Sequence, residues 1–150
     1  MAEDLQALRR ALPERAFVYT GIGSTECATL YRQWFVPANW MGAAGEIVPA
    51  GRAVPGRGVC MATPEGHPVP QGEAGVIHVH GRHLALGYWR DPDLTRASFA
   101  GPDAPGAWRR FVTGDVGRVR EDGLLEFHGR SDRQVKVRGF RVEPAEAESA

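Results

Sequence analysis

The sequence has few cysteines, a single lysine and no excess of either charge. Among its 150 residues, 18 are basic and 18 are acidic, so the formal net charge is zero. Nucleic-acid-binding domains usually carry a strong basic excess, and the balance of charge therefore argues against a nucleic-acid partner. Cys27 and Cys60 fit no metal-ligand spacing, and a cytosolic protein would keep both as reduced thiols.

Long apolar segments are also missing. No run approaches the length of a membrane span, and the N-terminal "MAEDLQALRR" lacks the apolar core of a signal peptide. We therefore expect a cytoplasmic protein that does not associate with a membrane. A hydrophobic fraction of 43% and a charged fraction of 24% are typical of a globular protein of about one domain.

The sequence does contain many short strand signals separated by glycine and proline. They predict an α+β, β-rich fold of short strands and hairpins with two or three short helices. One helix is expected at residues 3–12, ended by Pro13, and another at 91–99, capped by Asp91 or Asp93. Strands are expected at residues 17–19, 28–36, 59–63, 76–81 and 109–115, with hairpins at 116–130, around "EDG", and at 133–143, joined at Gly139.

The segment "GIGSTE" combines two glycines with hydroxyls and a carboxylate. Glycines let a backbone approach a ligand, Ser24 and Thr25 can donate to phosphate oxygens, and Glu26 can hold Mg²⁺ through oxygen. The alternative is an ordinary loop between two strands. No "GK[ST]" follows, so the segment is not a Walker loop.

A second acidic position follows the strand signal in "FVTGDVGR". We expect Asp115 in a glycine-flanked turn just after that strand. A carboxylate there can accept both hydroxyls of a ribose, although Thr-Gly-Asp is more often simple turn chemistry.

The densest cationic segment lies near the C-terminus, in "GRSDRQVKVRGFRVEP". Asp132 interrupts its positive charges, and three valines give it a face that can be buried. This mixture favours a hinge-and-strand element beside an anionic ligand over a solvated tail.

Taken in order, these segments resemble the adenylation domains of nonribosomal peptide synthetases, within the wider class of adenylate-forming ligases. "GIGSTE" is similar to the family's Tyr-Gly-Pro-Thr-Glu loop, and "EIVPAGRAVPG" to its Val-Pro-Ile-Gly-Arg-Pro stretch. "GEAGVIHVHGRHLALGYW" and "RRFVTGDVGRVREDGLLEFHGRSDRQVKVRG" resemble two further blocks. The resemblance covers residues 18–148 and implies a distorted, barrel-like subdomain.

The resemblance also implies roles for individual residues near the glycine loop and the second acidic position. Thr25 would contact phosphate beside Gly23 and Ser24, and Glu26 would bind Mg²⁺. Asp115 would hold the ribose hydroxyls. Arg130 would reach the ribose or the phosphate.

Further roles follow for the C-terminal segment. Asp132 would be the hinge between a large subdomain, residues 1–131, and the start of a small one, residues 132–150. Lys136 and Gly139 would belong to the face presented for thioester formation. One departure from the family is Ile22, which stands where a tyrosine stacks on adenine.

The function implied by the resemblance is activation of an amino acid with ATP and Mg²⁺, followed by transfer to the phosphopantetheine thiol of a carrier protein. The partners would be the remainder of the adenylation domain, the carrier protein and a small MbtH-like helper. The family's phosphate loop and C-terminal lysine are not found in the sequence, so we expect this chain alone to be inactive. Two alternatives stay open, an acyl- or aryl-CoA ligase fragment and a non-catalytic docking module.

Overall fold

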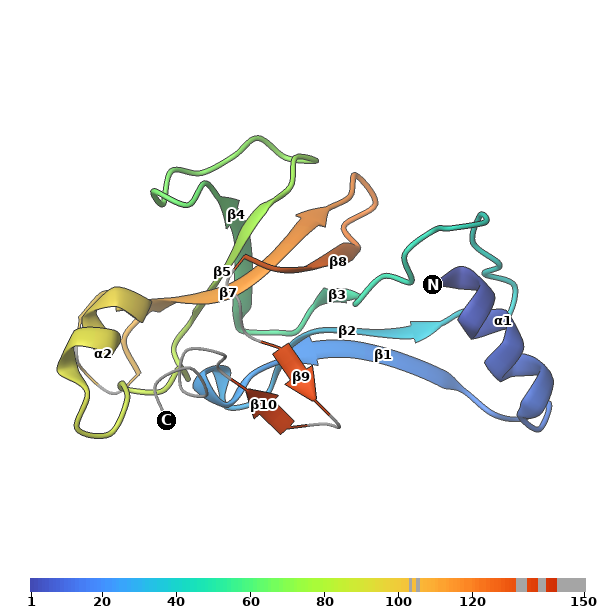
Figure 1. The fold of residues 1–150 in the computed structure, drawn as a ribbon, viewed down its shortest axis with the longest axis horizontal. Coiled ribbons are helices and arrows are strands. Elements are labelled where there is room, and N and C mark those ends of the chain that lie inside the picture. Colours follow the sequence, from blue (N-terminus) through green and yellow to red (C-terminus); the bar gives the residue numbers. More distant parts are fainter. Residues whose placement is uncertain (103, 105, 132–134, 138–139, 143–150) are drawn as a thin grey trace.

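The computed structural model describes residues 1–102, 104, 106–131, 135–137 and 140–142, the last two ranges for their backbone alone. Within them the chain is rich in strands and has two α-helices and one 3₁₀ helix (Figure 1). The elements are α1 (Ala2–Ala11), β1 (Val18–Gly23), η1 (Thr25–Cys27), β2 (Leu30–Val36), β3 (Arg52–Ala53), β4 (Arg57–Ala62), β5 (Gly75–Gly81), α2 (Pro92–Ser98), β6 (Phe99–Ala100), β7 (Arg109–Val119), β8 (Leu125–Arg130), β9 (Val135–Val137) and β10 (Phe140–Val142).

All strand pairs are antiparallel among the described residues, and they form open sheets. One sheet has the order β1-β2-β3, and a second has the order β4-β5-β7-β6, with β8 also paired to β7. Strands β9 and β10 form a hairpin. The predicted β-rich α+β fold is therefore confirmed, with open sheets in place of a closed barrel in the part that the structure describes.

The hydrophobic core lies between the first two sheets. Tyr31 of β2 packs in one buried cluster with Ile77 of β5, Phe111 of β7 and Leu125 of β8. An isolated bridge between Gly51 and Leu125 further connects the two sheets. The core thus holds β2 against β5, β7 and β8, while α1 and α2 lie at opposite ends of the molecule (Figure 1).

Local sequence signals gave most elements correctly. Helix α1 ends two residues before Pro13, as expected. Helix α2 is capped by Asp91, whose Oδ1 accepts a hydrogen bond from the Leu94 backbone N–H at 2.9 Å, with Pro92 in the first turn. The β7–β8 hairpin closes through Arg120 and Leu124 around the "EDG" turn.

Two boundaries near the glycine loop and the Thr-Gly-Asp segment are wrong. Gly21 and Gly23 belong to β1 instead of a loop, because β1 stays paired with β2 as far as Gly23. A Cβ on Gly23 would lie 2.7 Å from the Cα of Leu30, so glycine is needed for this close pairing. Asp115 lies inside β7 instead of a turn after it, since the left-handed Gly114 (φ 74°) lets the strand continue past an irregularity.

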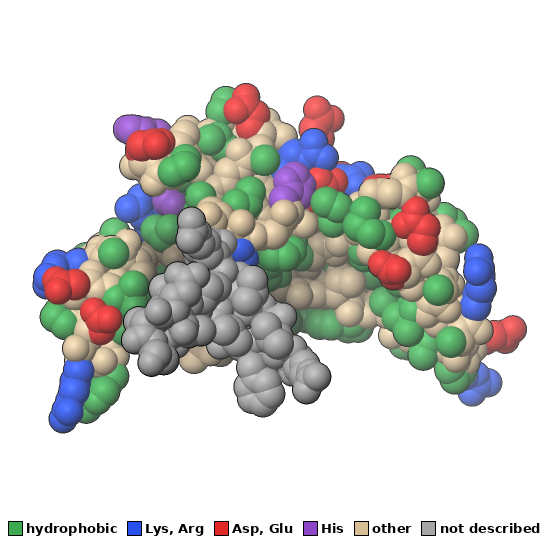
Figure 2. Space-filling model, in the orientation of Figure 1, with side chains coloured by type: hydrophobic (Ala, Val, Ile, Leu, Met, Phe, Trp, Pro, Cys, Tyr) green, Lys and Arg blue, Asp and Glu red, His purple; other side chains and the backbone are tan. Residues whose placement is uncertain are grey.

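Charged side chains are interspersed over the face shown in Figure 2, which agrees with the zero net charge. In the described part of the chain, the helices are too short and too polar to span a bilayer.

We predict that Gly51→Ala destabilises the fold far more than Gly56→Ala. Both glycines have positive φ, 115° and 76°. A Cβ on Gly51 would lie 2.2 Å from the Gln33 carbonyl, whereas a Cβ on Gly56 would meet open space. The left-handed backbone alone costs about 1–2 kcal/mol, and the clash should add about 1–3 kcal/mol for Gly51. Chemical denaturation followed by circular dichroism measures both, and equal losses would contradict the clash.

Candidate nucleotide-binding site

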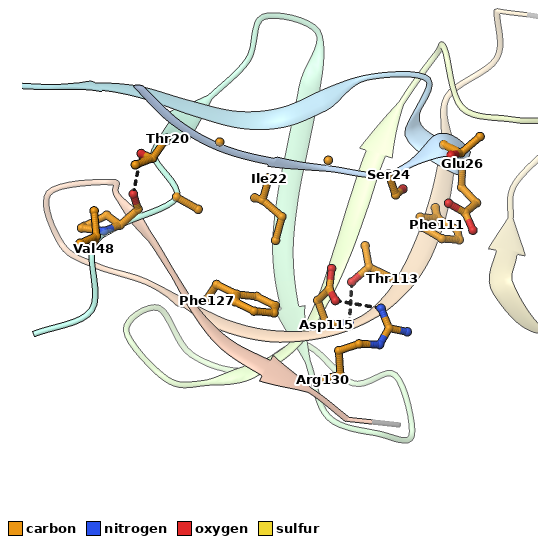
Figure 3. Close-up of a pocket in the computed structure, with 15 residues that line it drawn as sticks. Thr20, Ile22, Ser24, Glu26, Val48, Phe111, Thr113, Asp115, Phe127 and Arg130 are labelled. Atoms are coloured by element: carbon orange, nitrogen blue, oxygen red, sulfur yellow. Dashed lines mark hydrogen bonds and ion pairs between the residues drawn. The ribbon is translucent and has the colours of Figure 1, made fainter. Parts of the chain in front are cut away.

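A cavity of about 660 Å³ separates β1 and the following η1 turn from β7 and β8 (Figure 3). Its volume falls within the range of small-molecule sites. Six of the residues predicted from the sequence line it, coming from two segments far apart in the chain: Gly23, Ser24, Thr25, Glu26, Asp115 and Arg130. The fold therefore brings residues 23–26, at the end of β1 and in η1, and the Thr-Gly-Asp segment of β7 to opposite walls of one cavity.

Asp115 enters the cavity because β7 is irregular at this point. His78 pairs with Val112 and Val76 with Val116, so three β7 residues stand opposite one residue of β5. Such bulges bend a strand and redirect side chains, and they are common beside active sites. The Thr113 hydroxyl stabilises the bulge, since it accepts the Asp115 backbone N–H at 3.0 Å and donates to the Ile77 carbonyl at 2.9 Å.

The Asp115 carboxylate contacts two side chains from other strands. Arg130, its cross-strand partner on β8, donates from Nη1 to Oδ1 at 3.0 Å. The Tyr31 hydroxyl, from β2, lies 3.3 Å from Oδ2. The side chains of Asp115 and Arg130 are 15% and 22% exposed, so both are shielded from bulk water and still accessible to a ligand.

Glu26 occupies the opposite wall and is itself buried, with 7% exposed. Its Oε1 accepts a hydrogen bond from the Tyr88 hydroxyl at 2.9 Å, and its backbone carbonyl accepts the Ala85 N–H at 2.7 Å. Segment 85–88 thus fixes the position of η1 and of the carboxylate. A buried carboxylate held in this way suits an oxygen-preferring cation.

Ser24 and Thr25 form the turn before Glu26, and both residues line the cavity. Thr25 is exposed and Ser24 half-buried, and the Ser24 carbonyl accepts the Cys27 N–H to start the 3₁₀ turn. Cys27 packs into the core behind them, and its burial raises the pKa of its thiol. The thiol therefore acts as a core residue. Ser24 Oγ is buried as well, so the exposed residue of this turn is Thr25.

Apolar groups cover the remaining walls. Ile22 of β1, Phe111 of β7 and Phe127 of β8 all line the cavity (Figure 3). A flat aromatic base can pack between such groups. Ile22 lines this cavity, and its place beside an adenine base stays a prediction.

Three contributors to the site carried no usable signal in the sequence. Tyr31 and Thr113 position Asp115, and Tyr88 holds Glu26, yet only long-range pairing brings them there. Tyrosines in strand-like segments are more often core residues. Their spacing from the acidic residues follows no local motif.

The predicted C-terminal residues are placed less completely. The backbone of Lys136 lies in β9, opposite Arg141. Asp132 and Gly139 lie outside the described residues.

Comparison with known proteins shows the family of the chain. The family model "AMP-binding enzyme" matches residues 1–89, more than half of the chain. The chain belongs to the AMP-binding enzyme family.

Similar proteins place it more narrowly. A dimodular nonribosomal peptide synthase of Bacillus subtilis (strain 168) is 46% identical over 101 residues, which cover 67% of this chain and 4% of that protein. The structure of PA1221, an NRPS protein containing adenylation and PCP domains, has a TM-score of 0.78 and 32% identity, covering 99% of this chain and 30% of that one. The anthranilate CoA ligase AuaEII in complex with anthranoyl-AMP has a TM-score of 0.60 and 31% identity, covering 87% and 23%.

The chain therefore spans less than a third of these proteins. The predicted resemblance to nonribosomal peptide synthetase adenylation domains is confirmed. The same comparisons support an adenylate-forming class of chemistry.

Proposed function

We propose that this chain supplies one part of the nucleotide site in an adenylation domain that activates an amino acid with ATP. The observation that supports it most directly is the cavity itself. It places the carboxylate of Asp115 opposite the hydroxyls and carboxylate of residues 24–26. That separation suits a nucleotide, whose ribose and phosphates need different partners.

In this proposal each polar wall has one task. Asp115 accepts hydrogen bonds from the ribose hydroxyls, and Arg130 lies beside it to reach the ribose or a phosphate. Thr25, with Ser24 and the exposed backbone of Gly23, faces the phosphates.

The residues present also fit a magnesium ion. Mg²⁺ prefers oxygen ligands and is commonly held by one or two carboxylates together with substrate phosphates. Glu26 offers a buried, oriented carboxylate for this purpose. The bound ion would neutralise the negative charge of the phosphates, which is the largest electrostatic task of such a site.

The proposed reaction has two steps. An oxygen of the amino-acid carboxylate attacks the α-phosphorus of ATP, and pyrophosphate leaves as the acyl adenylate forms. A thiol then loses its proton and attacks the acyl carbon, which forms the thioester and breaks the bond to phosphate, so that AMP and a proton are released.

The proposed thiol is the phosphopantetheine of a carrier protein, in a cytoplasmic setting. PA1221 contains adenylation and PCP domains and matches 99% of this chain, whereas the CoA ligase matches 87% with a lower TM-score. By resemblance, glutamine at position 134 also favours the peptide-synthetase branch of the family over the acyl-CoA branch. By resemblance alone, we propose Asp132 as the hinge, Lys136 and Gly139 on the thioester-forming face, and a MbtH-like helper as a partner.

Free CoA is the second candidate acceptor, because AuaEII shares the fold at 31% identity. The test uses the protein with any flanking sequence that its gene encodes. Amino-acid-dependent exchange of pyrophosphate into ATP is expected, followed by loading of a phosphopantetheinylated carrier protein in preference to free CoA. Preferential acylation of CoA would favour the ligase, and the absence of both exchange and ATP binding would favour a docking module.

A further inference from the structure

The buried hydroxyl of Tyr31 is the one polar contact that β2 makes with the proposed ribose site among the described hydrogen bonds. Tyr31 is fully buried, in the core cluster that separates β2 from β7. Its ring crosses this core, and its hydroxyl lies 3.3 Å from Asp115 Oδ2. The contact therefore connects the β1-β2-β3 sheet with the sheet that contains β7 and Asp115.

The direction of this hydrogen bond is fixed by chemistry. Burial, followed by the nearby Asp115 carboxylate, raises the pKa of Tyr31, so the phenol stays protonated. An ionised carboxylate only accepts hydrogen bonds. Tyr31 is therefore the donor and Asp115 the acceptor.

Arg130 and Tyr31 hold the two carboxylate oxygens differently. Arg130 has a long side chain at the cavity wall, 22% exposed, and can exchange Asp115 for a ligand oxygen. Tyr31 has only two side-chain torsions and is locked by core packing. Tyr31 is thus the more rigidly held of the two contacts.

At 3.3 Å the contact is longer than a usual O–H···O hydrogen bond. Each carboxylate oxygen can also accept two hydrogen bonds, so the Tyr31 contact does not itself exclude a ribose hydroxyl.

We propose that Tyr31 is a positioning residue for nucleotide recognition, whose hydroxyl orients the Asp115 carboxylate toward both hydroxyls of the ribose. This inference rests on the proposed function, since it requires Asp115 to bind a ribose. It adds a residue on β2 that determines preference for a complete ribose.

The test compares ATP with 2′,3′-dideoxy-ATP in the protein with its native flanking sequence. Wild-type protein should bind ATP more tightly than the dideoxy analogue. Tyr31→Phe removes only the hydroxyl, and should reduce this preference about tenfold, the lower end of the effect of one hydrogen bond to a charged group. The loss should fall on ATP, while affinity for the dideoxy analogue changes by less than about twofold.

Two further variants make the result specific. Tyr19→Phe removes a tyrosine hydroxyl that bonds Gln33 Oε1 at 2.8 Å, away from Asp115, and should leave the preference unchanged. Tyr31→Met fills the core with a flexible apolar chain, and should lose the preference as Tyr31→Phe does.

The outcomes separate the two proposals. If wild-type protein does not distinguish the two nucleotides, the ribose site itself is wrong, and this inference is wrong with it. If wild-type distinguishes them but the Tyr31 variants keep the full preference, or weaken both nucleotides equally, Tyr31 is only a core residue and the proposed function stands.

Discussion

Replacing Asp115 with Ala should lower ATP affinity by about a hundredfold or more in the protein with its native flanking sequence. Two hydroxyl-to-carboxylate hydrogen bonds would be lost, each contributing about 1.5–3 kcal/mol because one partner is charged. The Asp115 side chain is only 15% exposed, so in the variant water compensates poorly for the hydrogen bonds that the ribose loses. Affinity for the amino acid should change much less. Calorimetric titration with a non-hydrolysable ATP analogue, and separately with the amino acid, measures both effects.

The matched control is Asp93→Ala. Asp93 also pairs with an arginine, Arg96, but on the surface of α2, where the two side chains are 88% and 71% exposed. Exposed pairs contribute little to stability, and this pair lies outside the cavity. ATP affinity that survives Asp115→Ala, in a variant whose thermal unfolding matches wild type, would remove Asp115 from the site.

The parts of the fold that depend on local chemistry could be predicted from the sequence. Asp91 and Pro92 mark the start of α2, and "EDG" marks the β7–β8 turn, because caps and turns depend on a few adjacent residues. Glu26 and Asp115 were also predicted for one site, through the order of the motifs. Both residues line one cavity, and the roles assigned to them there stay predictions.

The parts that depend on strand pairing could not be predicted. Asp115 was expected in a turn. The sequence does not reveal that β5 continues beside this segment, so that residues 113–115 form a bulge in β7. Tyr31 is 84 residues away from Asp115, and the strand signal of its segment does not show what its hydroxyl meets. Long-range contacts of this kind follow only from the register of the sheets.

The other acidic residue of the cavity provides a test of the proposed phosphate side. Glu26 has a buried carboxylate, and Tyr88 donates to one of its oxygens at 2.9 Å. Glutamine has the same shape and keeps an acceptor for Tyr88, so Glu26→Gln removes the charge and little else. The substitution therefore separates electrostatics from packing.

Glu26→Gln should reduce the rate of ATP–pyrophosphate exchange by about 10²–10³, the loss expected for one preorganised electrostatic contact. The Mg²⁺ concentration needed for half-maximal rate should rise, since a neutral amide is a weaker ligand for a hard cation. Tyr88→Phe keeps the charge and loses only the orienting hydrogen bond, so a smaller loss of about tenfold or less is expected.

Glu126→Gln is the control, because Glu126 is equally buried, at 6% exposed, but pairs with Arg118 at 2.6 Å outside the cavity. Equal losses for Glu26→Gln and Glu126→Gln, or an unchanged Mg²⁺ dependence, would show that Glu26 supports the fold and does not hold the metal.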